Sequence, residues 1–369
     1  MAKSSGADYT GLEMLNGEKM DRILIVNVNW IGDVLFSTPA IRALRECYPK
    51  AHIACVVVPR CKEILELSPH LDELIIYDEK AGGGLVAKMR MIASLRARHF
   101  DAVFLFHRSL TRTLMVALAG IRERIGDYNP KRGFLLTTKV NLQEAGAHKV
   151  EQFLNIVNPV REPCFSNGVK SKCDLPSSNN MELFIGKDDE LFAEEFLASR
   201  GIKDSDALIV LNPGGNWNLK RWPAENFASL GDKLSELFDA RILITGADKD
   251  AELAAFIAGL MKHKPIISCG KTTLRQLAAL LKRANLVISN DSGPMHIAVS
   301  QGAKTIAIFG PTDPKATGPY GDGKYVVIHK KPRAKKCRVP CYNLRCEDNA
   351  CIKAVSVEDV IREAKILLE

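Results

Sequence analysis

Short apolar runs alternate with amphipathic stretches through the first half of the chain. Residues 22–27 are rich in β-branched side chains, which predicts a buried strand, and residues 33–48 then carry apolar side chains at helical spacing up to Pro49. Further strand-like runs lie at 52–58, 73–77 and 101–106, with helical stretches between them. Strands that alternate with helices in this way predict a parallel sheet with helices on both of its faces.

This alternation stops at residues 161–182, which have little apolar content and are rich in proline, glycine, serine and asparagine. Such a composition predicts a linker or a long loop. The pattern then restarts, with strands expected at 207–211, 242–245, 265–268, 286–289 and 304–309 and helices at 223–238, 251–261, 273–281, 294–301 and 356–368. We therefore expect an N-terminal extension (1–21), two similar α/β domains (22–182 and 183–355) and a last helical segment (356–369).

The net charge of +8, from 51 Lys and Arg against 43 Asp and Glu, is unevenly distributed over the 369 residues. Residues 88–132 hold ten basic residues and three acids, and residues 330–345 hold seven basic residues and no acid. Each block is thus net +7, and the remainder of the chain is net −6. Such blocks are either solvated faces or surfaces that meet something anionic.

Three classes of protein are disfavoured by the sequence. No run approaches the roughly 18 consecutive apolar residues of a membrane-spanning helix, and the first 21 residues lack the apolar core of a secretory signal. Ten cysteines without such a signal favour a reducing cytoplasm over a disulfide-rich secreted fold. No Gly-x-Gly-x-x-Gly follows either opening strand, which argues against a dinucleotide-dependent dehydrogenase.

One segment resembles a nucleotide-binding motif without matching it. Gly270-Lys-Thr-Thr273 looks like the end of a P-loop, but Pro265 stands where that motif requires a glycine. We therefore expect a turn into a helix, with Thr272 or Thr273 as its cap.

Two acidic pairs and four cysteines have spacings that metal sites also use. The pairs Asp204/Asp206 and Asp248/Asp250 stand beside predicted strands, where acids are common in solvated turns. The four cysteines between 337 and 351 match the spacing of structural zinc ligands only in part. We expect turn residues at the acidic pairs, whereas reduced thiols, a metal site and a disulfide all stay open for the cysteines.

Residues 289–296 carry the strongest chemical signal in the chain. A predicted strand ends here, and Asp291 and Ser292 are residues that commonly begin a helix. The free N–H groups and the positive end of such a helix favour a phosphate, and Gly293 permits close approach of the backbone. His296 lies within the first turn and points at the same ligand in this interpretation. Alternatively, Asp291 or Ser292 is only a helix cap, and His296 packs in the core.

A second anion-binding turn is predicted at residues 212–223, directly after a strand. Gly214 and Gly215 free the backbone to surround an anion, and Lys220 is a point charge suited to a diphosphate. An ordinary surface loop is the alternative. Two such turns in one half of the chain indicate a nucleotide or sugar-nucleotide site in the second domain.

The corresponding turn of the first domain is Asn29-Trp-Ile-Gly-Asp33. Asp33 stands near a predicted helix N-terminus, whose dipole stabilises an ionised carboxylate. It is either an acid that caps or charges the helix, which is the commoner use of aspartate, or a general base.

Together these motifs resemble glycosyltransferase family 9, the bacterial ADP-heptose:lipopolysaccharide heptosyltransferases. The resemblance spans about residues 22–366, and the motifs that carry it are Asn29-Trp-Ile-Gly-Asp33, Asn212-Pro-Gly-Gly215, Lys220-Arg-Trp-Pro223, Asn290-Asp-Ser-Gly-Pro-Met-His296 and Phe309-Gly-Pro311. The Trp-Ile-Gly-Asp and Lys-Arg-Trp-Pro forms look most like the type II enzyme, which adds the second heptose.

This resemblance implies an α/β GT-B fold, in which two Rossmann-like domains face each other across a cleft, the first binding the acceptor and the second the donor. It also implies direct displacement with inversion at the anomeric carbon, without a metal or other cofactor. Asp33 matches the family's proposed base, and Lys220 matches the lysine on the donor diphosphate. The further donor-binding positions are Asn212, Gly214, Gly215, Glu252, Asp291, Ser292, Gly293 and His296. The candidate acceptor-binding positions are Asn29, Trp30, Arg108 and Arg112.

The implied partners are an ADP-heptose donor and an anionic glycolipid acceptor, with no role for nucleic acid. We expect a cytoplasmic protein whose two basic blocks contact the inner face of the bacterial inner membrane. In this fold the last helix is expected to pack back on the first domain. The alternatives are a family member with another nucleotide-sugar or acceptor, and a non-catalytic nucleotide- or glycan-binding protein on the same scaffold.

Overall fold

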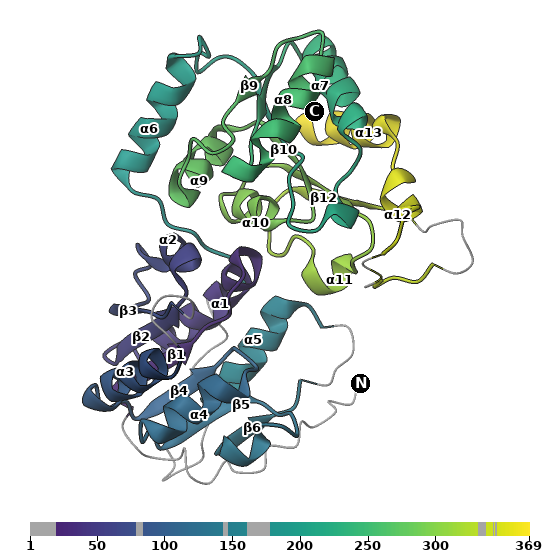
Figure 1. The fold of residues 1–369 in the computed structure, drawn as a ribbon. Coiled ribbons are helices and arrows are strands. Elements are labelled where there is room, and N and C mark those ends of the chain that lie inside the picture. Colours follow the sequence, from purple (N-terminus) through teal and green to yellow (C-terminus); the bar gives the residue numbers. More distant parts are fainter. Residues whose placement is uncertain are drawn as a thin grey trace, which may run out of the picture. The chain divides into compact units, whose positions relative to one another are not determined.

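The computed structural model describes residues 20–78, 84–142, 147–160, 178–330, 337–341, 343 and 345–369. Most of the expected N-terminal extension, most of the expected linker and much of the second basic block lie outside these residues. The chain forms two compact units, Met1–Asn179 and Asn180–Glu369 (Figure 1). The division falls close to the boundary expected after residue 182.

The first unit is built on a six-stranded parallel sheet with the order β3-β2-β1-β4-β5-β6. Its strands are β1 (Arg22–Val26), β2 (His52–Val57), β3 (Glu73–Ile76), β4 (Ala102–Leu105), β5 (Glu123–Asp127) and β6 (Thr138–Val140). β1 is a central strand, since it pairs with β2 and β4, with Val26 opposite Val56 and Leu105, and it is buried because helices cover both faces of the sheet. This is the strand order of a Rossmann sheet. The strands all run in parallel, and the order in which successive strands are added along the sheet reverses between β1 and β4.

Helices cover both faces of this sheet (Figure 1). They are α1 (Ile31–Cys47), α2 (Lys62–Leu65), α3 (Gly84–Ala97), α4 (Leu110–Leu118) and α5 (Lys149–Val157). α3 and α4 share one hydrophobic core with Leu24 and Val26 of β1. α1 packs along α5. Each of these strands except β5 is therefore followed by a helix, as the alternating pattern predicts, whereas β5 leads to β6 through the 3-10 turn Gly133–Leu135.

The second unit repeats the architecture, with a parallel sheet of order β12-β11-β10-β7-β8-β9. Its strands are β7 (Leu208–Asn212), β8 (Arg241–Ile244), β9 (Ile266–Ile267), β10 (Leu286–Asn290), β11 (Thr305–Phe309) and β12 (Tyr325–His329). When it is read from β9 to β12, this is again the Rossmann order, and the reversal lies between β7 and β10.

The helices of the second unit form two layers. They are α6 (Lys187–Ala198), α7 (Ala224–Phe238), α8 (Ala251–Leu260), α9 (Leu274–Arg283), α10 (Gly293–Ser300), α11 (Pro314–Thr317), α12 (Ala350–Lys353) and α13 (Val357–Leu368). α7, α8 and α13 enclose one hydrophobic core, and α9 packs against both α6 and α10. None of the helices in the described part of the chain has the length and apolar content to cross a membrane.

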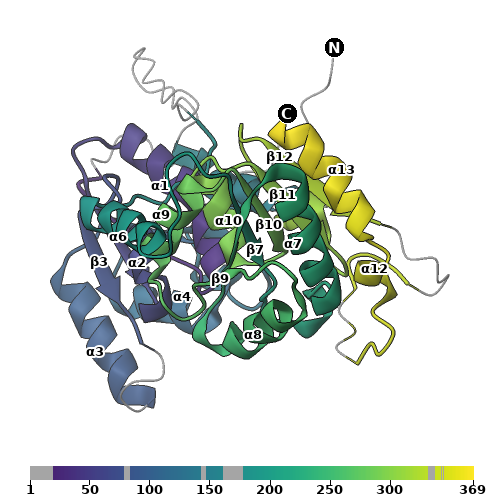
Figure 2. The ribbon, with the colours of Figure 1, turned by 90° about the horizontal axis from the view of Figure 1, so that it is seen from above.

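The last helix, α13, packs on the second unit. Val357, Val360 and Ala364 are buried in the same core as Ile306 and Ile328 of β11 and β12, and Figure 2 shows α13 beside these strands. The expectation that this helix packs on the first domain is therefore wrong. Its apolar stripe is used to complete the core over the second sheet, next to α7.

The start of α9 confirms the interpretation of Gly270-Lys-Thr-Thr273 as a turn into a helix. The Thr273 hydroxyl accepts from the backbone N–H of Gln276, and the Gln276 side chain accepts from the N–H of Thr273. This reciprocal pair is a capping box, which satisfies N–H groups that the first turn leaves without helical partners.

Candidate active site

The residues expected to carry chemistry gather where each sheet reverses its strand order. In the first unit, the connections after β1 and β4 carry Asn29, Asp33 and Arg108. In the second unit, the connections after β7 and β10 carry residues 212–220 and 291–296. Open α/β sheets bind their ligands outside the carboxyl ends of the strands at such a reversal. Each unit therefore has a candidate site at the corresponding place.

A buried polar network joins the ends of β7 and β10. The Asn212 side chain donates to the hydroxyl oxygens of Ser289 and Ser292, at 2.8 Å each. The side-chain oxygen of Asn290 accepts from the backbone N–H of Trp222 at 3.1 Å. Because both amides are buried and hydrogen-bonded, they fix the two turns relative to each other.

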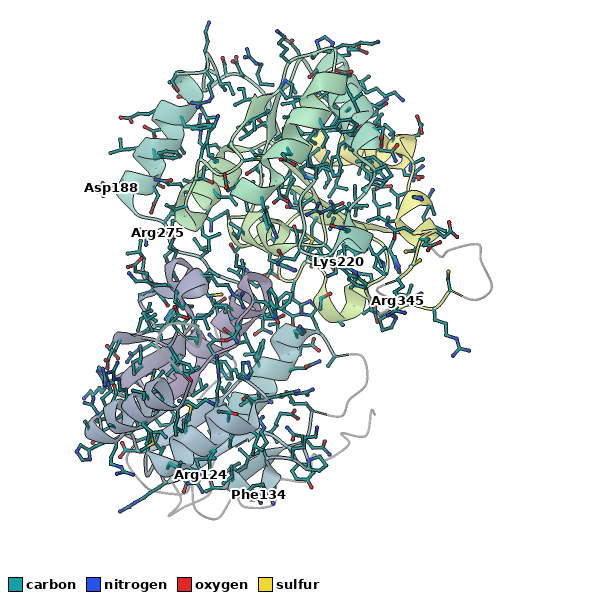
Figure 3. The ribbon with its side chains drawn as sticks, in the orientation of Figure 1. Arg124, Phe134, Asp188, Lys220, Arg275 and Arg345 are labelled. Carbon is teal, nitrogen blue, oxygen red and sulfur yellow. The ribbon has the colours of Figure 1, made fainter. Side chains whose placement is uncertain are left out.

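Lys220 and Asp291 bring opposite charges together at this edge. Lys220 ends the 3-10 turn Asn218–Lys220 and donates from Nζ to Oδ2 of Asp291 at 2.6 Å. The Thr312 hydroxyl donates to the same oxygen at 2.6 Å. Asp291 is buried, whereas Lys220 (labelled in Figure 3) is partly exposed. An ammonium group beside the start of α10 is suited to a phosphate.

The first glycine of the β7 turn leaves room for the neighbouring loop. A Cβ atom on Gly214 would lie 2.7 Å from Oδ2 of Asp250, whereas one on Gly215 would meet nothing closer than 3.8 Å. The carbonyl of Gly215 accepts from Arg221, at 3.0 Å from Nε and 2.6 Å from Nη2, and Arg221 also lies 3.3 Å from Asp250. Of these two glycines, only Gly214 stands at a position where a larger side chain would clash.

The remaining expected donor-binding residues differ in their placement. Ser292 is the N-cap of α10, and Gly293 is its first residue. His296 is buried in the first turn of this helix, which also fits the interpretation as a packed core residue. Glu252 is exposed in the first turn of α8, two residues beyond Asp250.

Asp33 lies in the first turn of α1 and forms an ion pair with Lys149, the first residue of α5. Nζ of Lys149 is 2.6 Å from Oδ1 of Asp33, and both side chains are partly buried. The N-cap of α1 is Trp30, and the N-cap of α5 is His148, whose Nδ1 accepts from the N–H of Val150 at 3.2 Å. This cap fixes the start of α5 and with it the position of Lys149.

Two arginines from other elements hold the turn between β1 and α1. Arg112 donates to the carbonyl of Asn27 at 3.0 Å and to the side-chain oxygen of Asn29 at 2.9 Å. Arg60 donates to the carbonyl of Asn29 at 2.8 Å, and its guanidinium carbon lies 4.5 Å from the centre of the Trp30 ring. Arg112 is 3% exposed and Trp30 is 55% exposed. Arg112 therefore supports the turn, whereas Trp30 and Arg60 are accessible to a ligand.

Cys61 lies under the same turn and is not a nucleophile. Its Sγ donates to the carbonyl of Asn29 at 3.3 Å. Burial raises the pKa of Cys61 to about 11, and the charge of Asp33 adds to this, although Arg60 acts in the opposite direction. The thiol therefore stays protonated at neutral pH, and the thiolate is the form that reacts.

Arg108 and Arg132 flank Asp127 at the end of β5. Nε of the exposed Arg108 lies 2.5 Å from Oδ2 of Asp127, while the fully buried Arg132 donates to the backbone carbonyls of Asp127 and His107. Burial raises the pKa of Asp127, and the two arginines oppose that shift. Arg108 is therefore accessible to a ligand. Arg132 instead links the chain after β4 to the end of β5 through its hydrogen bonds.

Both members of the first acidic pair bind groups of the protein itself. Asp206 accepts from the backbone N–H of Lys203, and Asp204 forms an ion pair with Arg283. The structure holds no group of three or more His, Cys, Asp or Glu residues placed to bind a metal ion, as far as the described residues extend. The tail cysteines that are free thiols are Cys337, Cys341, Cys346 and Cys351.

Three residues of these sites, Lys149, Arg60 and Asn290, stand outside the expected set. Lys149 meets Asp33 across 116 positions of sequence, so no local pattern could reveal the pair. Asn290 donates to the carbonyl of Pro213 at 2.8 Å and so joins the turns that follow β7 and β10. Asn290 could have been identified from its position in the predicted strand. It comes one residue after Ser289, and Ser289 pairs with Asn212 at the end of β7.

Two Rossmann-like units, with glycine-containing turns at the reversal of the second sheet, are the architecture of GT-B glycosyltransferases. The chain belongs to glycosyltransferase family 9 (heptosyltransferase), whose sequence model matches residues 88–346. It is therefore a glycosyltransferase, and its GT-B fold agrees with that of solved heptosyltransferase structures.

Similar proteins align over nearly the whole chain. The lipooligosaccharide heptosyltransferase 2 of Campylobacter jejuni subsp. jejuni serotype O:2 is 34% identical over 358 residues, which cover 94% of this chain and 98% of the relative. The crystal structure of a family 9 glycosyl transferase from Veillonella parvula is 27% identical, with a TM-score of 0.80 over 95% of this chain and 98% of that one. The ADP-heptose lps heptosyltransferase II of E. coli, at 22% identity, shares the fold with a TM-score of 0.74 over 94% of this chain and 98% of that one.

Proposed function

We propose that this protein transfers heptose from ADP-heptose to the inner core of lipopolysaccharide, with inversion at the anomeric carbon. The sugar and the nucleotide are those that the names of its relatives state, a heptosyltransferase 2 and an ADP-heptose lps heptosyltransferase II. The observation that carries the proposal is the complementary chemistry at the two sheet reversals. The second unit presents a cation beside a helix N-terminus, and the first presents a carboxylate held by a lysine.

In the proposed reaction the second unit binds the donor. Lys220 and the start of α10 neutralise the diphosphate and the negative charge that grows on it as the bond to the anomeric carbon breaks. The ion pair with Asp291 keeps the Lys220 ammonium group at this edge, and Asn212 fixes the turn through Ser292. Glu252, two residues beyond the Asp250 loop, is proposed to contact the ribose.

The first unit is proposed to bind the acceptor and to supply the base. The Asp33 carboxylate takes the proton of the acceptor hydroxyl, whose oxygen then forms the new bond to the anomeric carbon while ADP leaves. Lys149, at 2.6 Å, holds one oxygen of that carboxylate and keeps the group oriented. Lys149 is thus a positioning residue in this account.

The proposed acceptor surface surrounds Asp33. Asn29, Trp30 and Arg108 offer an amide, an exposed indole ring and an exposed guanidinium group, which suit sugar hydroxyls, sugar faces and anionic substituents. Arg112 acts through Asn29, to which it donates at 2.9 Å. Because such an acceptor is an anionic glycolipid, we propose a cytoplasmic protein in peripheral contact with the inner face of the inner membrane.

Transfer assays with matched donors and acceptors test this function. The purified protein is incubated with ADP-heptose, ADP-glucose or UDP-glucose and with core acceptors that end before the first heptose, at the first heptose or at the second heptose, and the products are weighed by mass spectrometry. We expect one heptose to be added, from ADP-heptose, to the acceptor that ends in the first heptose. Transfer from another nucleotide-sugar would identify a family member with a different donor. ADP binding without transfer to any acceptor would indicate a binding protein, and either result contradicts the proposal.

A further inference from the structure

The first unit exposes apolar side chains on the outer side of α3 and α4. Of the sixteen large apolar residues that are exposed among the described residues, seven lie on these helices and on the adjoining 3-10 turn Gly133–Leu135. We call them the α3–α4 surface; they are Leu85, Val86, Met89, Leu110, Leu114, Leu118 and Phe134. Leu85 is 74% exposed and Phe134, labelled in Figure 3, is 75% exposed.

The spacing of these residues is that of an outward helix face. On α4 the three members are four residues apart and form one stripe, while Met115 and Val116 face the sheet. On α3, Leu85 and Met89 repeat at the same interval, while Ile92 belongs to the core. The core is complete without the outer face, and clustered apolar side chains on such a face mark an interaction surface.

Basic residues border the α3–α4 surface, and acidic residues are nearly absent from it. On these helices the basic residues are Lys88, Arg90 and Arg96, and the adjoining connections add Lys131 and Arg108, of which Arg108 is paired with Asp127. Between positions 84 and 122 the sequence contains one acid, Asp101. Its carboxylate accepts from the backbone N–H groups of Asp21 and Arg22, at 3.0 and 2.8 Å. The surface is therefore apolar and cationic, the combination that complements an anionic lipid headgroup layer.

Topology places this surface beside the candidate acceptor site. A helix that connects parallel strands begins near the carboxyl end of one strand and runs back along the sheet. Leu85 and Leu110 therefore lie at the carboxyl edge of the first sheet. Asp33, which follows β1, is at that edge as well.

We propose that the α3–α4 surface is the face with which this protein docks on an anionic phospholipid bilayer. Its apolar side chains enter the headgroup boundary, and the surrounding lysines and arginines contact lipid phosphates. The inference rests on the proposed function, because a lipid-anchored acceptor would then present its sugar at the edge that carries Asp33. It adds the particular surface, and that surface can be tested without any sugar substrate.

Vesicle sedimentation tests the surface directly. The full chain is mixed with phosphatidylcholine vesicles, either pure or with about one phosphatidylglycerol in three lipids, and bound protein is measured as a function of lipid and of salt concentration. The apolar variant combines Leu85→Ser, Met89→Ser and Leu114→Ser, and the charge variant combines Lys88→Gln and Arg90→Gln. A matched control combines Leu237→Ser, Phe256→Ser and Leu260→Ser, three exposed apolar residues of the second unit.

We expect the wild type and the control to bind the anionic vesicles, and the apolar variant to bind at least about tenfold more weakly. The charge variant should lose affinity mainly at low salt, where charges are least screened. Equal binding by the wild type and the apolar variant would overturn the inference, as would no wild-type binding to either vesicle. Concentration-dependent dimerisation that only the apolar variant loses, without vesicle binding, would instead assign the face to a second copy of the chain and also overturn it.

Transfer to a water-soluble acceptor separates this inference from the proposed function. If the wild type and the apolar variant both transfer heptose to it, failure of vesicle binding concerns the docking surface alone. If neither transfers, the proposed function fails whatever the vesicles show. Thermal unfolding of each variant confirms that these exposed positions can be changed without loss of the fold.

Discussion

At the scale of single residues, each candidate site holds its principal charge in an ion pair. Lys149 and Asp33 lie 2.6 Å apart in the first unit, and so do Lys220 and Asp291 in the second. Partly buried pairs of this kind fix the direction of both groups, and removing one partner leaves the other without its counter-charge. The roles of the two lysines can therefore be separated by substitution.

Replacing Lys149 with methionine should impair the chemical step and leave donor binding intact. Without the ammonium group the Asp33 carboxylate loses its fixed orientation, and we expect kcat to fall about tenfold, equivalent to about 1.4 kcal/mol. The affinity for ADP, measured by calorimetry, should stay within about twofold, and Lys149→Arg should restore part of kcat. An unchanged kcat in Lys149→Met would remove Lys149 from the mechanism.

Replacing Lys220 with alanine should weaken ADP binding by about tenfold or more. The variant removes the charge that meets the diphosphate and leaves the buried Asp291 carboxylate bonded to Thr312 beside it. Lys233→Ala is the matched control, since Lys233 forms an exposed ion pair with Glu358. Equal ADP affinity in all three proteins would exclude Lys220 from the donor site.

Local sequence identifies turns well and partners in space poorly. Asp33 and Lys220 could be named in advance because each follows a strand and a glycine-containing turn, and the family motifs assigned them roles. Their assigned roles stay predictions. Arg112 was expected at the acceptor, but its guanidinium is buried and bonded to Asn27 and Asn29. Such contacts cannot be read from spacing, because they join segments that only the fold brings together.

At the scale of elements, apolar runs predicted most of the strands, whereas β5, β6 and β12 were not foreseen. β1, β4, β7 and β10 are buried throughout or nearly so and were expected within a residue or two of their bounds. β5 has a single large apolar residue, Ile125, and was not foreseen. Its place comes from pairing with β4, where a Cβ on Gly126 would lie 3.1 Å from the Leu105 side chain.

The start of α13 should make the second unit sensitive to acid. Burial alone would raise the pKa of Asp359, but hydrogen bonds from Lys330 and Ser356 outweigh it and hold the pKa below its ordinary value. A carboxyl group whose folded-state pKa is lowered stabilises the protein above its unfolded pKa, about 4, and loses this contribution as the pH falls further. Asp359→Asn should therefore lower the free energy of unfolding by about 1–2 kcal/mol at pH 7 and by less at pH 3.

Urea unfolding followed by tryptophan fluorescence measures this difference, since Trp222 is buried in the second unit. Its indole N–H donates to the carbonyl of Val355, next to the start of α13. If the difference in the free energy of unfolding between wild type and variant is the same at both pH values, the capping geometry of Asp359, and not its charge, determines its contribution to stability.

At the scale of the whole molecule, two units of equal topology carry different chemistry. Each unit has its own sheet and its own hydrophobic core. Binding of the donor nucleotide should therefore change the backbone dynamics of one unit only. We expect ADP to slow hydrogen exchange of the backbone at 213–222 and 291–296, where the binding turns lie, and to leave 27–33 unchanged. Protection at 27–33 in place of the second-unit turns would reverse the assignment of donor and acceptor units.

The Asp33→Asn variant tests whether Asp33 deprotonates the acceptor during heptose transfer. Wild type and variant are incubated with ADP-heptose and the heptose-terminated core acceptor, the product is quantified by mass, and ADP affinity is measured in parallel. We expect the wild type to add one heptose and the variant to be slower by about a hundredfold or more, with unchanged ADP affinity. Transfer by Asp33→Asn at the wild-type rate would contradict this expectation.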